Sequence, residues 1–349
     1  MALGGGVFVT QNKVLPGSYI NFVSASKASA TLGERGTVAI ALPIGKQAGK
    51  VITITRAEFV QNCKAFFGVE SSDESMVALR EIFCNSVKAY VYDLGSTEAL
   101  KTVAEACAAL EPYDFNILCA YTGTSSDITS YITQVKSWRD DMGKKCQLVI
   151  YNGTDPDYEG VINVMSKPAN SSAPAHALVA WVAGAEAGAE VNESCTNMKY
   201  NGEYEIVCDK TQTALEQCIK DGELVFHLVY GDVCVLEDIN SLVTTSVDKG
   251  EDFKSNQTMR VIDQIANDIA KLFNTKYLGK VPNNKSGRVS LWADIVSHHR
   301  QLEDIQAIEN FDSSLLTVEQ GNTKKAVVVN DVVTPVNAMA QLYMTVIIQ

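Results

Sequence analysis

The stretch Lys88-Ala89-Tyr90-Val91-Tyr92-Asp93-Leu94 opens the part of the chain that decides the fold. Its aromatic and β-branched residues are typical of a β-strand. Ser96 fits the N-cap of a helix that runs to residue 110. The alternation continues with a strand over 115–121, a helix over 126–142 and a strand over 146–151. A β-α-β-α-β run of this kind predicts a parallel sheet with right-handed crossovers.

Further strands and helices are predicted on both sides of this run. Upstream, strands are expected over 19–23, 37–42 and 51–54, followed by helices over 56–67 and 73–85. Downstream, the pattern predicts helices over 174–189 and 211–220 and strands over 204–208, 224–230 and 233–236. The sequence therefore predicts an α/β fold for this part of the chain.

A change of pattern at residues 240–250 predicts a second domain of the α+β class. Amphipathic helices are expected over 257–277 and 289–308, and Thr334-Pro335 fits the start of a short helix to residue 342. Between them, two strands flank the turn signal Gln320-Gly321-Asn322-Thr323 and predict a β-hairpin. Its apolar strand residues are Leu315, Leu316, Thr317 and Val318 before the turn and Ala326, Val327, Val328 and Val329 after it.

The last residues of the chain form a strand-like segment with no partner in sequence. They are Tyr343, Met344, Thr345, Val346, Ile347 and Ile348, followed by Gln349. Alternation places apolar side chains on both faces, which is the pattern of a strand that is covered on both sides. Chain ends fray unless something holds them, so this segment is expected to insert into a sheet.

A second strand-like segment lies near the N-terminus, at Val7, Phe8, Val9 and Thr10. A lone two-stranded hairpin is marginal in water, and its open edges favour association. Strands donated by neighbouring copies would extend the hairpin into a four-stranded sheet. Such a contact is heterologous and can propagate as a polymer. The alternative is that both ends pair with the hairpin of their own chain.

Composition sets limits on function. The 349 residues carry a net charge of −12, which argues against nucleic-acid binding. Residues 1–56 hold six basic residues against one acidic residue, a net charge of +5, so the rest of the chain carries −17. The nine cysteines form no CxxC motif and are expected to be reduced core thiols. No secretory signal or membrane span is recognised.

No catalytic or cofactor motif is recognised, so neither cofactor nor metal is expected. The chain lacks GxSxG, GxxxxGK[ST], GxGxxG and HExxH. His298-His299, with Glu303 and Asp304 nearby, leaves a metal site open, although adjacent helical residues diverge. The rival function is a cytosolic α/β nucleotide-binding enzyme that uses the turns at Ser96 and Thr122, at the carboxyl ends of parallel strands. Ordinary helix caps explain these turns as well.

Several segments, in order along the chain, resemble contractile phage tail sheath proteins. The most specific is Lys249-Gly250-Glu251-Asp252-Phe253-Lys254-Ser255-Asn256, which continues into residues 260–269. The others lie at 16–23, 35–45, 233–242, 307–311 and 334–339. The chain is similar to the short sheaths of Gram-positive prophages and of phage-tail-like bacteriocins.

The resemblance implies a non-enzymatic subunit of a six-start helical homopolymer around a tail tube. It implies a subtilisin-like α/β domain without protease chemistry, an inner C-terminal domain, and terminal β-arms that neighbouring subunits exchange. The corresponding divisions are an N-terminal arm at 1–17, a β-rich region at 18–86, the α/β domain at 87–240, the inner domain at 241–342 and a C-terminal arm at 343–349.

The resemblance also implies partners and a location. Contraction would drive the tube through the target cell envelope, and the expected partners are the tail tube, the baseplate and the tail terminator. Assembly is expected in the bacterial cytoplasm, within a virion tail or phage-tail-like particle, with no membrane insertion. Tube contact is expected from basic residues of the inner domain. These are Lys271, Lys276, Lys280, Lys285 and Arg288.

Overall fold

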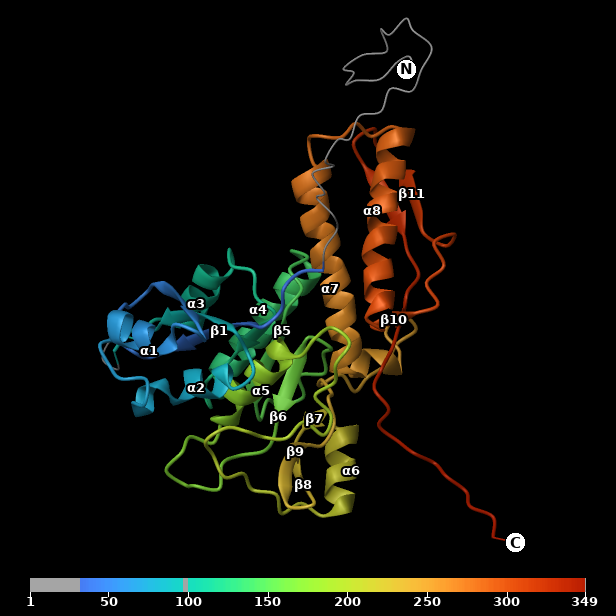
Figure 1. The fold of residues 1–349 in the computed structure, drawn as a ribbon. Coiled ribbons are helices and arrows are strands. Elements are labelled where there is room, and N and C mark those ends of the chain that lie inside the picture. Colours follow the sequence, from blue (N-terminus) through green and yellow to red (C-terminus); the bar gives the residue numbers. More distant parts are fainter. Residues whose placement is uncertain (1–31, 97–99, 349) are drawn as a thin grey trace, which may run out of the picture.

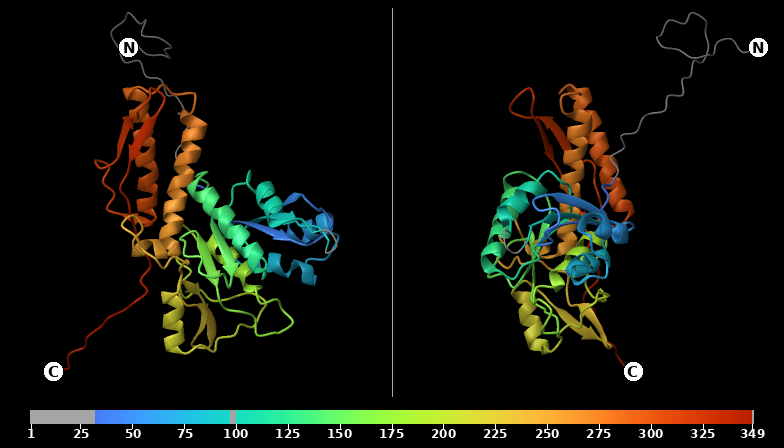
Figure 2. Two further views of the ribbon diagram at one scale, coloured as in Figure 1. Left: turned by 180° about the vertical axis from the view of Figure 1, so that it is seen from behind. Right: turned by 90° about the vertical axis from the view of Figure 1, so that its left-hand side faces the viewer.

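The computed structural model describes residues 32–96 and 100–348. An α/β domain carries a second lobe, in which two long helices and a hairpin stand beside it (Figure 1). The views in Figure 2 show that the two long helices extend beyond the α/β domain at one end. No helix within the described ranges has the length and apolarity that a membrane span requires.

The α/β domain is built on a seven-stranded sheet in the order β2-β3-β1-β4-β5-β6-β7. Every neighbouring pair is parallel except β2 and β3, so the predicted parallel sheet is confirmed with one antiparallel edge strand. The strands are β1 (Thr37–Leu42), β2 (Val51–Thr55), β3 (Lys88–Asp93), β4 (Ile117–Cys119), β5 (Gln147–Tyr151), β6 (Val161–Val164) and β7 (Glu223–Leu224).

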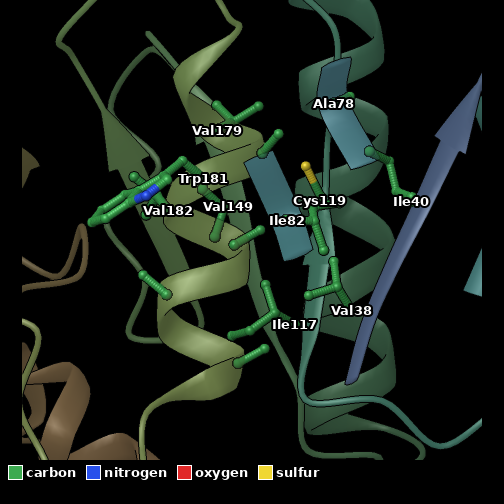
Figure 3. Packing of buried hydrophobic residues seen from close by; sticks show 14 of the residues in the cluster. Val38, Ile40, Ala78, Ile82, Ile117, Cys119, Val149, Val179, Trp181 and Val182 are labelled. Carbon is green, nitrogen blue, oxygen red and sulfur yellow. The ribbon is translucent and has the colours of Figure 1, made fainter. Parts of the chain in front are cut away.

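Helices cover both faces of this sheet. One face packs against α2 (Val77–Phe83) and α5 (Leu178–Gly188), and the other against α3 (Val103–Leu110) and α4 (Ser125–Asp140). Successive side chains of β1 point to opposite faces of the sheet, so this strand contributes to both helix layers. Figure 3 shows Val38 and Ile40 with the residues of α2 and α5, while Ala39 and Ala41 belong to the opposite layer.

Shorter helical elements complete the α/β domain. They are α1 (Phe59–Asn62), a π-helix over Cys63–Phe67, a 3₁₀ turn over Glu74–Met76 and α6 (Gln212–Lys220).

Helices α2 and α5 approach closely because α5 carries two glycines at their contact. A Cβ atom at Gly184 would lie 2.3 Å from the carbonyl oxygen of Ile82, and one at Gly188 would lie 2.2 Å from that of Asn85. Ten of the eleven residues of α5 are buried, among them Trp181 (Figure 3). The Ala- and Gly-rich composition therefore creates a close helix contact inside the core.

Three local predictions for the α/β domain are wrong. Helix α3 begins at Val103 and not at 96, because Thr102 and Glu105 form a capping box at its start. The expected strand 224–230 is divided: β7 ends in the main sheet, and β8 (Phe226–Val229) pairs with β9 (Asp232–Val235) as a separate hairpin. The expected strand 204–208 makes only one bridge, between Ile206 and Pro168.

The second lobe consists of α7 and α8 with two small β-pairs. A 3₁₀ turn (Glu251–Lys254) precedes α7 (Asn256–Leu272), which ends in a π-helix (Phe273–Tyr277), and α8 runs over Lys285–Asp304. The predicted hairpin is present as β11 (Thr317–Gln320) and β12 (Val327–Asn330). A second antiparallel pair joins β10 (Ile308–Glu309) to β13 (Thr334–Pro335).

The short helix expected over 334–342 is wrong. This segment is extended, because its backbone hydrogen bonds go to other parts of the chain. Val336 N–H donates to the Ala307 carbonyl at 3.0 Å, and Ala338 N–H donates to Gln257 Oε1 at 2.9 Å. Tertiary partners therefore replace the local helical bonds that the Thr-Pro start suggested.

Candidate assembly surfaces

The β11–β12 hairpin packs one face on the helices and leaves the other face open. Leu316, Val318 and Val327 contact a core formed by α7 and α8, and Trp292 Nε1 donates to the Leu316 carbonyl at 3.0 Å. Val328 is 46% exposed on the opposite face. Since the hairpin pairs with no third strand in the described parts of the chain, both of its edges remain available for pairing.

A groove runs beside β11, between this strand and the first turns of α8. Its volume is about 400 Å³. Val289, Trp292 and Val318 give it an apolar wall, and Lys285 and Arg288 give it a basic rim. An apolar side chain that projects from a strand added to β11 would meet this wall.

The C-terminal segment is attached at its root and exposed beyond it. Asn337 Oδ1 lies 3.1 Å from Thr258 Oγ1 and 3.3 Å from Ser255 Oγ, in addition to the two backbone bonds of Val336 and Ala338. Beyond this root, large apolar side chains are each at least 70% exposed. They are Met339, Leu342, Tyr343, Met344, Val346, Ile347 and Ile348.

The exposed segment leads away from the hairpin of its own chain. Figures 1 and 2 show it leaving the body at the end opposite the tips of α7 and α8. No residue from 339 to 348 is part of a strand. Residues 332–349 also contain no Asp, Glu, Lys, Arg or His, so nothing charged favours the solvated state of this segment. The matching N-terminal residues Val7, Phe8, Val9 and Thr10 lie outside the described residues.

The lysines that we expected at the tube lie at or near the end of the helical lobe. Lys271 and Lys280 are exposed near the end of α7, and Lys285 begins α8. Lys276 is ion-paired with Asp294 at 2.6 Å, which leaves it less available than the others.

Sequence reasoning missed two further lysines at this end. Asn283 Nδ2 donates to the Lys324 carbonyl at 3.1 Å and to the Ala326 carbonyl at 2.8 Å, which holds the hairpin turn, with Lys324 and Lys325, beside the helix connection. We call the set Lys271, Lys276, Lys280, Lys285, Arg288, Lys324 and Lys325 the basic tip.

Buried ion pairs attach α7 to the α/β domain. Arg260 is fully buried and lies 2.6 Å from Glu186 Oε2 on α5 and 3.3 Å from Asp238 Oδ2. Burial opposes its charge, but Asp238 and Glu186 outweigh burial and raise the pKa of Arg260. Burial, reinforced by Asp238, raises the pKa of Glu186 to about 8.

A second buried pair joins Arg139 of α4 to Asp263 of α7, with two contacts of 2.5 and 2.8 Å. These pairs link segments that lie far apart in the sequence, and no local motif indicated them.

Beside Ser96, part of the crevice considered for a nucleotide is occupied by a side chain of the protein. The Asp93 carboxylate, at the end of β3, accepts hydrogen bonds from the backbone N–H groups of Gly45, Lys46, Gln47 and Gly95. Burial alone would raise the pKa of Asp93, but these donors lower it. Backbone donors that could hold a phosphate are therefore committed to a carboxylate.

The possible metal site at His298-His299 is not supported by the positions of the acids. Glu303 accepts hydrogen bonds from Arg300 and from Phe311 N–H instead of facing the rings. The histidines contact Asp268 and Asp331, which sequence reasoning did not consider.

Two family models match most of the described chain. The phage tail sheath protein central domain matches residues 96–241, and the phage tail sheath C-terminal domain matches residues 248–349. The chain belongs to the phage tail sheath family. Sheath proteins are structural, and this chain is accordingly a structural protein and not an enzyme.

Curated relatives agree with the assignment. The sheath chain is 29% identical over 253 residues to the phage-like element PBSX protein XkdK of Bacillus subtilis, covering 68% of this chain and 54% of that protein. It is 25% identical over 203 residues to the tail sheath protein of Clostridium phage phiCD119, and the match covers 58% of this chain and 56% of that protein. The chain thus spans about half the length of the curated relatives it matches.

Solved sheath structures share the fold over nearly the whole chain. A sheath tail protein from Desulfitobacterium hafniense has a TM-score of 0.82 at 26% identity, covering 93% of this chain and 97% of that chain. The contracted helical sheath of the anti-feeding prophage has a TM-score of 0.72 at 17% identity, and the match covers 95% of this chain and 99% of that chain. At that identity the second likeness concerns the fold alone.

Proposed function

We propose that this sheath chain polymerises into a helical tube by exchanging terminal strands, and that the tube contracts around a tail tube. The observation that carries the proposal is the combination of an apolar, uncharged, exposed C-terminal segment with a hairpin whose edges are unpaired. The segment and the hairpin each need a strand to pair with, and the segment leads away from the hairpin of its own chain. Pairing between copies satisfies both.

The acceptor is the hairpin, and the donors are residues 343–348 and Val7–Thr10 of neighbouring copies. Each ladder hydrogen bond contributes about 0.5–1.5 kcal/mol and each large apolar side chain that becomes buried about 1.5–3 kcal/mol. Once one strand has paired, the next pairs at a high effective concentration, so several links per subunit bind more strongly than one. Donor and acceptor are different surfaces, so the contact propagates in an open helix, expected to have six starts.

The way that the subunit is built supports contraction. The buried ion pairs fix α7 to the α/β domain, so the body moves as one unit while the arms act as tethers. The extended sheath is kinetically trapped, and a baseplate signal releases it. The likeness in fold to the contracted sheath of the anti-feeding prophage supports the contracted form.

The basic tip supplies the contact with the tail tube, by charge complementarity. Baseplate and tail terminator bind the two ends of the sheath. The assembly forms in the bacterial cytoplasm and functions in a virion tail or phage-tail-like particle.

Deletion of residues 343–349 tests the proposal. The truncated chain is expected to fold with the thermal stability of the full chain, because these residues make few contacts in the single chain, and to remain monomeric in sedimentation and electron microscopy. Deletion of Gln349 alone is the control and should leave tubes intact. Tubes formed by the longer deletion would contradict strand exchange.

The rival nucleotide-binding function is tested separately. Because Asp93 occupies the backbone donors of the crevice, nucleotides are expected to leave the melting temperature unchanged. A clear increase with any nucleotide would favour the rival.

A further inference from the structure

Two adjacent histidines on α8 face each other inside the base of the helical lobe. His298 and His299 are both fully buried, and their Nδ1 atoms lie 3.3 Å apart. The outer nitrogen of each ring meets a carboxylate. His298 Nε2 lies 3.0 Å from Asp268 Oδ2 on α7, and His299 Nε2 lies 2.6 Å from Asp331 Oδ2, just after β12.

The partners determine how many protons the pair needs. An ionised carboxylate only accepts hydrogen bonds, so each Nε2 carries a hydrogen. Two neutral rings would then place two bare Nδ1 lone pairs against each other. Two imidazolium rings would place two N–H groups against each other. One added proton gives an N–H···N hydrogen bond at the observed distance.

We propose that His298 and His299 share a single proton between their Nδ1 atoms and that this proton-bound pair latches together the roots of the two terminal arms. The pair then carries one positive charge between two carboxylates, Asp268 and Asp331. The other groups at this site are neutral: Gly33 N–H and Gln264 donate to Asp268, and the Phe311 ring packs on His299.

Charged groups on the outer side of α8 engage each other instead of the rings. Arg300 pairs with Glu303 and lies over the outer part of Phe311, with its guanidinium 5.3 Å from the ring centroid. The two carboxylates therefore balance the charge of the shared proton, and no second cation pairs with them among the contacts that the structure describes.

The latch joins the two ends of the chain. Gly33, near the first described residue, donates its N–H to Asp268 at 3.1 and 3.2 Å. Asp331 immediately precedes the C-terminal segment. A hydrogen-bonded path thus runs from Gly33 through Asp268, His298 and His299 to Asp331.

A small apolar core supports the same junction. Leu32 from the N-terminal side and Val333 from the C-terminal side both pack against it. Its buried members include Val261 of α7 and Leu302 of α8. The roots of both arms therefore share one core and one hydrogen-bonded path.

Loss of the proton breaks the path at its centre. The N–H···N hydrogen bond exists only while the pair holds its proton, so this link is present at lower pH and is lost as the pH rises. Both roots then loosen together. The latch rests on the proposed function only in treating the two ends as arms, and the measurements below test it in the subunit whether or not tubes form.

Nuclear magnetic resonance of the full chain with ¹⁵N-labelled histidine measures the proton directly. The chain has only four histidines, and the variants His298→Gln and His299→Gln assign the two signals. The expected result near about pH 7 is one proton correlated with both Nδ1 atoms. Two neutral rings with bare Nδ1 atoms would overturn the proposal. So would a signal that disappears with a chelator, since that would identify a bound metal.

Hydrogen exchange measures the coupling of the two roots. The readouts are peptides that contain Gly33 and Val336, whose amides are hydrogen-bonded at the roots. After correction for intrinsic exchange, protection of both peptides should fall together by about tenfold or more as the pH is raised and the pair loses its proton. In the His298→Gln variant, the protection of both peptides should already be low and should not change with pH.

A matched control comes from the same helix. Asp304 is exposed at the end of α8, and Asp304→Asn should keep the protection and pH profile of the unaltered chain. A variant His298→Gln that kept the pH-dependent step, or a C-terminal root that loosened without the N-terminal root, would overturn the latch.

Discussion

Single residues inside this sheath subunit are positioned by charge as well as by shape. Arg260 contacts the carboxyl groups of Asp238 and Glu186 in a region without solvent access, and the ionised form of Glu186 is disfavoured there. A buried charge is stable only with close partners, so the network holds α5, α7 and Asp238 in one arrangement. The two predictions below concern individual side chains in this core.

Glu186→Gln should make stability less sensitive to pH. Burial raises the pKa of Glu186 from its ordinary value of 4.5 to about 8, so the folded protein holds this proton to a higher pH than the unfolded chain does. Between these values the folded state binds more protons, so the free energy of unfolding falls as pH rises. The variant should lose this fall, a difference on the order of 1–3 kcal/mol. Urea denaturation at several pH values measures it, with exposed Glu216→Gln as control. Parallel pH profiles for Glu186→Gln and the unaltered chain would refute the assignment.

Gly184→Ala should destabilise the α/β domain. The added Cβ atom meets the Ile82 carbonyl oxygen at 2.3 Å, so α2 and α5 must separate, at a cost of about 1–3 kcal/mol. Thermal unfolding measures the loss. Gly250→Ala is the control, because that position is open. Equal melting temperatures for the two variants would show that the helix contact is more adaptable than described.

Elements of this protein differ in how completely their surfaces are covered. Strand β1 is covered on both faces, as expected for a central parallel strand. The β11–β12 hairpin is covered on one face only, by the core that contains Leu316 and Val327. This contrast identifies the hairpin as an element that assembly can complete.

Val328→Asp should block assembly without unfolding the subunit. Val328 lies on the open face, so the single chain should keep its stability within about 0.5 kcal/mol. A strand or neighbour that packs on this face would have to bury the new charge. Sedimentation and calorimetry measure the two effects. Val327→Asp, on the covered face, should instead lower stability. Normal tubes from Val328→Asp would exclude this face from the interface.

The whole molecule combines a rigid body with ends that leave it. Arg139 and Asp263 connect the two lobes through a buried bidentate pair, and Arg260 adds a second connection. Residues 339–348 have no comparable attachment to the body. This arrangement suits a subunit that rotates as a unit and stays tethered to its neighbours.

Asp263→Asn should weaken the connection between the lobes. It leaves Arg139 buried without its charge partner, which costs about 3–5 kcal/mol. Calorimetry should show two transitions in place of one, since the α7–α8 lobe can then unfold separately. The double variant Arg139→Met with Asp263→Leu should recover most of the loss. A single unshifted transition in Asp263→Asn would mean that the pair does not couple the lobes.

Much of the fold could be predicted from sequence because it depends on short-range patterns. Alternation from Lys88 to residue 151 predicted the parallel sheet, and the turn signal at Gly321 predicted the hairpin. The strand-like segment from Tyr343 is a prediction from its residues alone, and in the single chain residues 339–348 belong to no strand. Periodicity and turn chemistry act over a few residues, which is why these features were accessible.

Contacts between distant residues were decided by the tertiary structure. His298 meets Asp268 thirty positions away, and Gly33 meets the same carboxylate across 235 positions. The extended path after Thr334 depends on partners at Ala307 and Gln257. No local pattern encodes such pairings, because the energy of a buried hydrogen bond or ion pair depends on which groups the whole fold brings together.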